Sequence, residues 1–278
     1  DGSSKRAKAL KIPPLIIGLT LVSIGTSAPE ASVSINSSLN GMNDMSISNV
    51  IGSNIFNAFL IIGISSLICP LVIGTDVKKY DLPILLLLNI ILLIFCFVIT
   101  PYTLDIFESI SFLILLVSYI LFLIARTTRL NKKKAKKMTK ELLPANNTIT
   151  NKPKKELPFW VSIILAILGL AGVIFGGDLV VNNVSSIAKS LGMSESLVGL
   201  TIVSVGTSLP ELVTSVVASI KKENDIALGN VIGSNIFNIV FILGLSSTIS
   251  TLTVSSTILV DLVIMLLSAL IIFIISRY

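Results

Sequence analysis

The sequence predicts an all-α polytopic membrane protein made of two inverted-topology repeats with discontinuous transmembrane helices. Three observations predict this architecture: apolar runs of membrane-spanning length, a long motif that occurs twice, and basic residues that lie on one side. Of the 278 residues, 53% are hydrophobic and only 13% are charged. A soluble core does not need so much apolar sequence, so we expect the lipid bilayer to surround the chain.

Eight apolar runs are long enough, at about 20 residues each, to cross a bilayer. The first run is followed by further spans without a cleavage-site pattern, so it is not expected to be a signal peptide. One polar linker, rich in Lys, Asn, Thr and Pro, follows the fourth run. The predicted spans are centred in residues 12–38, 46–70, 82–100, 108–125, 159–181, 197–219, 226–249 and 256–276.

A motif of small and polar residues occurs twice in this apolar chain. GLTLVSIGTSAPE and SNVIGSNIFN in the first copy correspond to GLTIVSVGTSLPE and GNVIGSNIFN in the second. Residues 18–71 align with residues 199–252 without a gap, and more than half of the paired positions are identical. The sequence therefore uses one membrane unit twice.

The basic residues indicate the topology of the chain. If the first span begins inside, every Lys and Arg except Lys189 falls in an inner segment, namely 1–11, 71–81, 126–157, 220–225 or the C-terminal end. This distribution follows the positive-inside rule and supports the span count. The net charge of +6 is thus explained without nucleic acid, and we expect the basic loops to be cytoplasmic and the protein to lie in the cell membrane.

The two copies are predicted to enter the membrane from opposite faces. Residues 1–11, before the first motif, are basic, whereas the equivalent residues 182–192 carry one lysine. Inverted repeats place a substrate near the bilayer midplane, and rocking of one part against the other exposes it alternately. This arrangement favours a carrier.

Each motif contains a proline that should break its helix. Pro29 has no amide hydrogen to donate to the carbonyl of Gly25, and its ring clashes there, so we expect a break around Gly25–Ser27. Backbone carbonyls released at membrane depth are tolerated only where they line a cavity or meet a ligand. Their oxygen dipoles suit a hard cation.

Oxygen-bearing side chains recur every four residues on the predicted helices, so each set shares one helical face. The four sets are Thr26, Glu30 and Ser34; Asn49, Ser53 and Asn57; Thr207, Glu211 and Ser215; and Asn230, Ser234 and Asn238. By contrast, Asn54 and Asn235 fit helix packing as well as they fit ligation.

Glu30 and Glu211 are the only acidic residues near the middle of a predicted span, and no Lys or Arg lies deep enough to neutralise them. A charged side chain at this depth costs roughly 2.5–3.5 kcal/mol, so two converging carboxylates imply a bound cation or protonation. A divalent ion would balance the charge. Calcium prefers six to eight oxygen ligands, and the absence of histidine and of paired cysteines argues against zinc or copper.

GTSAPE and GTSLPE, each followed by NVIGSNIFN, resemble the two alpha-repeats of the calcium/cation antiporter superfamily, and most closely the prokaryotic-type sodium/calcium exchangers. The resemblance covers nearly the whole chain outside the central loop. It implies exchange of calcium for sodium by alternating access, without a cofactor, in a fold of ten helices. A proton-coupled or potassium-dependent antiporter of the same superfamily is the alternative, and a cation channel is a third possibility.

The resemblance also implies a set of ligands, carried over by matching motif positions, in which both ions share the glutamates. The implied calcium ligands are Glu30, Glu211, Thr26 and Thr207. The implied sodium or shared ligands are Ser27, Ser208, Ser53, Ser234, Asn57 and Asn238, with the backbone carbonyls of Ser23 and Ser204. Potassium-dependent branches carry aspartate at the position of Asn238, so this residue disfavours potassium co-transport.

The chain departs from the family pattern in having eight predicted spans where ten are expected. We therefore expect a fragment, in which residues 1–125 form a first repeat without its first helix and residues 158–278 a second repeat without its last helix. Residues 126–157 are the predicted basic cytoplasmic loop. No nucleophile and base pair, His cluster or phosphate loop is present, so we expect a transporter rather than an enzyme. We also expect it to be a monomer in the lipid bilayer and not to bind nucleic acid.

Overall fold

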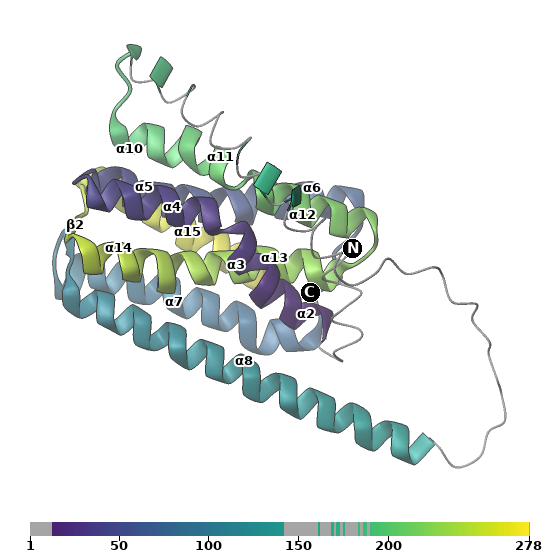
Figure 1. The fold of residues 1–278 in the computed structure, drawn as a ribbon. Helices are drawn as coiled ribbons and strands as arrows, with labels where there is room; N and C mark the ends of the chain where they lie inside the picture. The colour runs from purple at the N-terminus through teal and green to yellow at the C-terminus, as the bar shows by residue number, and fades with distance from the viewer. Residues whose placement is uncertain are drawn as a thin grey trace.

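The computed structural model describes residues 13–141 and 191–277, together with isolated residues between 161 and 190. The described parts form a helical bundle with one two-stranded antiparallel sheet (Figure 1). Here η denotes a π-helical segment. The first repeat contains α2 (Pro14–Ile17), η1 (Gly18–Val22), α3 (Ser23–Thr26), α4 (Ala28–Leu39), α5 (Asn43–Phe56), η2 (Asn57–Ile61), α6 (Ile62–Ile68), η3 (Val77–Asp81), α7 (Leu82–Ile94), η4 (Phe95–Ile99), β1 (Thr103–Leu104) and α8 (Ile106–Glu141). The second contains α10 (Glu195–Val198), η5 (Gly199–Val203), α11 (Ser204–Thr207), α12 (Leu209–Ile220), α13 (Asn224–Phe237), η6 (Asn238–Leu243), α14 (Gly244–Ile249), β2 (Leu252–Thr253) and α15 (Ser256–Ile275).

If each bent helix pair crosses the membrane as one span, the described helices account for seven of the eight predicted spans. Two spans consist of bent helix pairs, Pro14–Thr26 with Ala28–Leu39 and Ser196–Thr207 with Leu209–Ile220. The eighth predicted span, 159–181, lies outside the fully described residues. The five unbent helices that are long and apolar enough to cross a membrane are Asn43–Ile68, Val77–Ile99, Ile106–Asn131, Asn224–Ile249 and Thr257–Ile275.

Both bent spans break where the motif proline predicts a break. The two helices of each pair meet at 46° around Ser27 and at 42° around Ser208. Ser27 has φ −81° and ψ 9°, and Ser208 has φ −83° and ψ 5°, so each serine leaves the helical conformation. Pro29 and Pro210 follow in the first turn of the next helix, where a missing backbone N–H removes no helical hydrogen bond. The predicted break is confirmed, at Ser27.

Four π-helical segments occupy equivalent places in the two repeats. Segments η1 and η5 end directly before Ser23 and Ser204, and η2 and η6 begin at Asn57 and Asn238. A π-helical turn shifts the register of the backbone hydrogen bonds and often occurs at functional sites. The helices are therefore irregular next to four of the residues predicted to bind ions.

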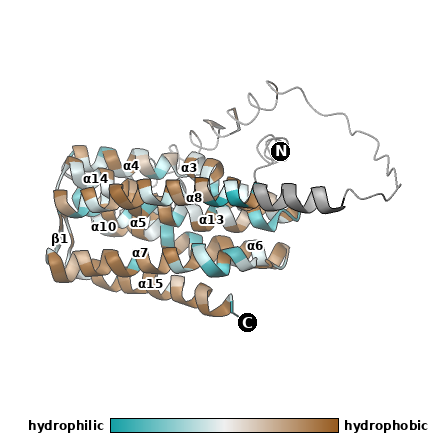
Figure 2. Cartoon of the chain, turned by 90° about the horizontal axis from the view of Figure 1, so that it is seen from below, coloured by the Kyte–Doolittle hydropathy of each residue, from teal (hydrophilic) through white to brown (hydrophobic). Residues whose placement is uncertain are grey.

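The helix Asn224–Ile249 lies at the centre of the bundle, and 89% of its most apolar stretch is buried. Helix α8 covers η6 and α14, while α15 lies beside α7. Figure 2 shows that α7 and α15 are hydrophobic along most of their length. Leu87, Ile90 and Val98 are exposed on the α7 span, as lipid-facing residues would be.

Glycines bring the bent spans against the straight ones. A Cβ atom added at Gly229 of α13 would lie 3.0 Å from the Cα of Gly18 in η1. In the equivalent crossing, a Cβ at Gly52 of α5 would overlap the carbonyl oxygen of Leu200 and the side chain of Ser204. Small residues permit such close approach between membrane helices.

Helix α8 is longer than the sequence indicated. The predicted span ends at residue 125 and the predicted loop begins at 126, yet the helix continues to Glu141. Lysine, alanine, methionine and glutamate, which dominate this stretch, are good helix formers, so the chain stays helical beyond the apolar region. The remainder of the predicted loop, 142–157, lies outside the described residues.

A buried ion pair joins the α7 span to α8. Nη1 of Arg126 lies 2.7 Å from Oδ1 of Asp81, and Nη2 lies 3.7 Å from Oδ2 of Asp76. The guanidinium also stacks over the ring of Tyr80, 5.4 Å from its centroid. Asp81 is fully buried, so it depends on Arg126 for charge compensation.

We expect Gly52→Ala to destabilise the protein by about 1–3 kcal/mol, because the new methyl group overpacks a backbone contact. Gly63→Ala is the matched control, because nothing lies within 4 Å of its Cβ position and alanine favours a helix. Thermal unfolding in detergent measures both variants. Equal unfolding midpoints for the two alanine variants would show that α5 does not approach α11 so closely.

Arg126→Met should destabilise the protein by about 3–5 kcal/mol, because it leaves the carboxylate of Asp81 buried without a partner. The double variant Asp81→Leu with Arg126→Met removes both charges and should recover most of this loss. The same thermal assay tests the pair. A single Arg126→Met variant that is as stable as the double variant would contradict a buried ion pair here.

Candidate cation-binding site

Two glutamates lie in the first turns of α4 and α12, directly after the two helix bends. Glu30 and Glu211 are fully buried, and each accepts a hydrogen bond from a serine of the other repeat. Ser208 Oγ donates to Oε1 of Glu30 at 2.9 Å, and Ser27 Oγ donates to Oε1 of Glu211 at 2.8 Å. These crossed bonds hold both carboxylates at the contact between the repeats. We call the region formed by Glu30, Glu211 and their serine and threonine neighbours the polar centre.

The second oxygen of each carboxylate is free. Oε2 of Glu30 and Oε2 of Glu211 are buried and accept no hydrogen bond. Neither glutamate forms an ion pair with any residue that the structure describes. A buried carboxylate oxygen without a donor is costly unless a proton or a cation meets it. The polar centre therefore contains two buried carboxylate oxygens, each of which can take a proton or bind a cation.

Two threonines reach across the repeat boundary in the same crossed manner. Thr26 Oγ1 donates to Oδ1 of Asn230 at 3.1 Å, and Thr207 Oγ1 donates to Oδ1 of Asn49 at 3.2 Å. The amide nitrogens of these asparagines donate within their own repeats, each to a serine hydroxyl, at 2.9 and 3.0 Å. Each threonine hydroxyl thus uses its proton and keeps lone pairs for an ion.

The serines of α5 and α13 behave differently in the two repeats. Ser234 Oγ donates to Oε1 of Glu211 at 3.3 Å, whereas Ser53 Oγ donates to the carbonyl oxygen of Ser204 at 3.5 Å. Both hydroxyls are buried. The polar centre is therefore not fully symmetric, because Glu211 receives one more donor than Glu30.

The backbone carbonyls predicted as sodium ligands already accept hydrogen bonds. Ser23 O accepts the N–H of Ser27 at 2.9 Å, and it lies 3.3 Å from the hydroxyl of Thr26, whose single proton it shares with Asn230. Ser204 O accepts the N–H of Ser208 at 3.1 Å, among other donors. A carbonyl oxygen has two lone pairs, so an ion at either carbonyl would replace one of these bonds.

Four asparagines at the ends of α5 and α13 form a second, adjoining network. Asn54 Nδ2 donates to Asn235 O and Asn235 Nδ2 donates to Asn54 O, both at 3.2 Å. Asn57 Nδ2 donates to Oδ1 of Asn235, and Asn238 Nδ2 donates to Oδ1 of Asn54, both at 3.0 Å. Oδ1 of Asn57 and Oδ1 of Asn238 remain buried without a partner.

All twelve residues proposed from the sequence as ion ligands are buried, and none is more than 4% exposed. Direct hydrogen bonds join ten of them in two corresponding sets, one around each glutamate: Glu211 with Thr26 and the serines at 23, 27 and 234, and Glu30 with Thr207 and the serines at 53, 204 and 208. Asn57 and Asn238 belong to the asparagine network beside it. The partners of Asn54 and Asn235 are not evident from the sequence, although Asn54 lies three residues before Asn57 and Asn235 three residues before Asn238.

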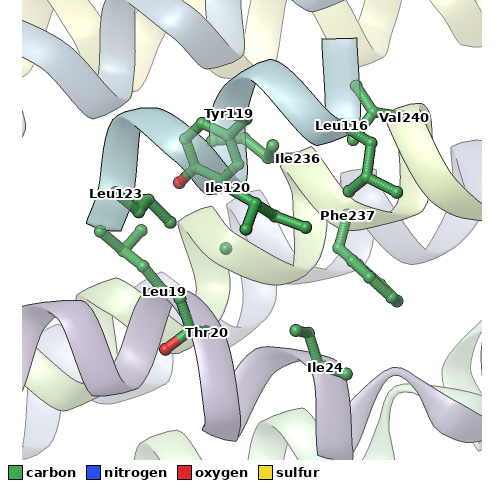
Figure 3. Close-up of a pocket in the computed structure, with 11 residues that line it drawn as sticks. Leu19, Thr20, Ile24, Leu116, Tyr119, Ile120, Leu123, Ile236, Phe237 and Val240 are labelled. Carbon is green, nitrogen blue, oxygen red and sulfur yellow. The ribbon is translucent and has the colours of Figure 1, made fainter. Parts of the chain in front are cut away.

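The polar centre is distinct from the small cavity in Figure 3. That cavity, of about 20 Å³, lies between η1, α8 and α13, and its lining is apolar apart from Thr20 and Tyr119. In the described ranges no three His, Cys, Asp or Glu residues gather as a metal cluster. A cation in the polar centre would therefore take most of its ligands from neutral oxygens, as calcium can.

Comparisons with known proteins identify the family to which the chain belongs. The family model described as sodium/calcium exchanger protein matches residues 1–125 and 161–278. The chain is 38% identical to the inner membrane protein YrbG of Escherichia coli (strain K12), over 86% of this chain and 70% of that protein. It is 33% identical to the sodium/calcium exchanger MaX1 of Methanosarcina acetivorans, over 91% of this chain and 78% of that protein.

A solved structure of the sodium-calcium exchanger NCX_Mj, soaked with 2.5 mM Na+ and 0.1 mM Ca2+, has a similar fold. The TM-score is 0.77 and the identity is 28%, and the match covers 100% of this chain and 83% of that one. Because the family model matches both repeats and the fold matches a solved exchanger over the whole chain, this chain belongs to the sodium/calcium exchanger protein family of membrane antiporters.

Proposed function

We propose that the chain exchanges calcium for sodium across a membrane by alternating access, and that both ions bind in the polar centre between the repeats. The observation that carries this proposal is the pair of free, buried Oε2 atoms of Glu30 and Glu211. Their two negative charges have no basic partner in the described part of the chain, so a mobile cation is the natural counter-charge.

Calcium fits the ligands that surround these two oxygens. The carboxylates of Glu30 and Glu211 would balance the charge of one divalent ion. The hydroxyl oxygens of Thr26 and Thr207 retain lone pairs after donating their protons to asparagine oxygens. Carboxylate, hydroxyl and carbonyl oxygens are the groups that calcium takes in sets of six to eight. We therefore propose these four residues as calcium ligands.

Sodium would use the same carboxylates together with neighbouring neutral oxygens. The proposed ligands are the hydroxyls of Ser27, Ser208, Ser53 and Ser234, the amide oxygens of Asn57 and Asn238, and the carbonyls of Ser23 and Ser204. Two carboxylates are neutralised either by one calcium ion or by two monovalent ions. Since both ions need the same charges, binding of one excludes the other, which is the requirement for exchange.

Contacts between loops support the proposed membrane topology. At one end of the bundle, Asn224 Nδ2 donates to Pro70 O at 3.0 Å, and Arg277 Nη2 lies 3.5 Å from Lys78 O. These residues lie in or beside segments that the positive-inside rule places on the inner side. We therefore propose that this end faces the cytoplasm and that the protein resides in the cell membrane.

The choice of sodium without potassium co-transport rests on Asn238. Its Nδ2 donates to Oδ1 of Asn54, which a carboxylate at this position could not do. The polar centre therefore contains two carboxylates rather than three. This observation favours sodium without potassium co-transport, and the proton-coupled and potassium-dependent alternatives are separated by the flux experiment below.

Glu30→Gln and Glu211→Gln should each weaken calcium binding by at least about 100-fold, because each removes one of the two charges that hold the ion. Calorimetric titration of the purified protein with calcium measures the loss. Glu108→Gln is the matched control, because Glu108 is also buried but accepts the backbone N–H of Asp105 outside the polar centre. Calcium affinity retained in either site variant would contradict the assigned site.

Uptake of radioactive calcium into vesicles that contain the protein should follow an outward sodium gradient and saturate with calcium concentration. An imposed potassium gradient should leave the rate unchanged, since the polar centre offers no third carboxylate, and a pH gradient without a sodium gradient should not drive uptake. Uptake that ignores the sodium gradient but follows protons or potassium would establish the alternative antiporter. Calcium flow that does not saturate would indicate a channel.

A further inference from the structure

The geometry points to Asn54 and Asn235 as an amide lock that fixes the orientation of the two ion-facing amides, Asn57 and Asn238, across the repeat boundary. Asn54 and Asn235 are positioning residues in this assignment, because they are not themselves proposed ligands. The inference rests on the proposed function, since it explains how two neutral ligands of that site are held.

The lock amides are anchored on backbone carbonyls of the opposite helix. Asn54 Nδ2 donates to Asn235 O, and Asn235 Nδ2 donates to Asn54 O. Each carbonyl lies in the last helical turn before a π-helical segment. There the N–H of Asn57 is shared between the carbonyls of Ser53 and Asn54. The N–H of Asn238 is shared in the same way between the carbonyls of Ser234 and Asn235. A carbonyl oxygen can only accept, so each lock amide has its Nδ2 towards the carbonyl and its Oδ1 away from it.

This fixed orientation is passed on to the next amide. Oδ1 of Asn235 accepts the Nδ2 of Asn57, and Oδ1 of Asn54 accepts the Nδ2 of Asn238, each at 3.0 Å. A flipped Asn57 or Asn238 would set two oxygens against each other and leave a buried N–H without an acceptor. The flipped state is therefore disfavoured, and the free Oδ1 atoms of Asn57 and Asn238 are the result.

The orientation matters because only one end of an amide binds a cation. An Oδ1 atom presents a partial negative charge, whereas a flipped amide would present N–H groups that repel the ion. With the lock in place, Asn57 and Asn238 are oriented before the ion arrives, so binding does not have to order them. The lock is also crossed: Asn54 of the first repeat orients Asn238 of the second, and Asn235 orients Asn57.

A role in packing alone does not explain these contacts. Asn54 and Asn235 each use both the nitrogen and the oxygen of the side-chain amide, and each partner lies on the other repeat. Packing would require only a side chain of suitable volume. The crossed pattern instead makes a specific prediction. Asn54 should affect ion binding through Asn238, and not through Asn57, which lies three residues further along the same helix.

A double-mutant cycle on calcium affinity tests this prediction. Asn54→Ala should weaken the binding of radioactive calcium to the purified full chain in lipid nanodiscs by about 3-fold to 10-fold, the effect of one lost hydrogen bond. In an Asn238→Ala background the same substitution should have little further effect, because the amide that it orients is already gone. Asn235→Ala with Asn57→Ala is the symmetric cycle and should behave in the same way.

The matched control is the cycle of Asn54→Ala with Asn57→Ala. The two side chains share no hydrogen bond, and the anchor of Asn235 on the backbone carbonyl of residue 54 survives the substitution. The fold-changes should therefore multiply. Independent effects in the Asn54 and Asn238 cycle, or equal coupling in the crossed and control cycles, would overturn the lock.

Two further measurements keep the test decisive. If Asn54→Ala does not fold, Asn54→Ser replaces it, because a hydroxyl cannot reach both partners and the same pattern of coupling is expected. Glu211→Gln in the same assay separates the two proposals. If it loses binding while all cycles are independent, the lock alone is wrong; if it binds calcium as well as the unmodified chain does, the proposed site and the lock are both wrong.

Discussion

Two like charges buried side by side repel each other, and the surrounding helices are arranged to hold them. Glu30 and Glu211 lie in the first turns of α4 and α12, where the positive end of a helix dipole favours a carboxylate. Each helix begins there because Pro29 and Pro210 break the spans in the middle. The serine at each bend then donates to the glutamate of the other repeat. One proline in each motif thus accounts for the bend and for the new helix start. The serine at the bend is thereby placed where it can donate to the glutamate of the other repeat.

Close packing makes these crossed bonds possible. A serine hydroxyl reaches only a few ångströms from its backbone, so the bent spans must approach α5 and α13 closely. Glycine provides that approach: Gly52 faces the segment around Ser204, and Gly233 faces Leu19 and Ser23. The polar centre is lined by short side chains for the same reason, because longer ones would separate the helices. Close packing of the helices and ion binding by short polar side chains therefore depend on each other. A small residue in this region can serve both purposes.

Much of the architecture could be predicted from local sequence, because its causes are local. A proline without an N–H, a four-residue spacing and a repeated motif predict the broken spans, the polar stripes and the two related halves. The crossed partners could not be predicted, because the contact of Ser27 with Glu211 depends on how two repeats pack. The roles of Asn54 and Asn235 could not be predicted for a related reason. The orientation of a side-chain amide determines whether its oxygen or its nitrogen faces a neighbour, and here residues of the other repeat set that orientation. The predicted span at 159–181 and the ten-helix pattern stay predictions.

The distinction between crossed and internal bonds bears on how an exchange cycle would avoid running without ions. Bonds within a repeat, such as those of Asn49 and Asn230 to serine, survive any movement of one repeat against the other. The crossed bonds of Ser27, Ser208 and the threonines do not, and each contributes about 0.5–1.5 kcal/mol. In the closed arrangement, where the ligands are buried, those few bonds also have to offset the burial of two carboxylates. If the proposed cation lies between the carboxylates, it offsets that cost, so closure would be favourable for the loaded site and unfavourable for the empty one. Inward and outward movements would then each require a bound ion, and this requirement couples the flux of one cation to the other.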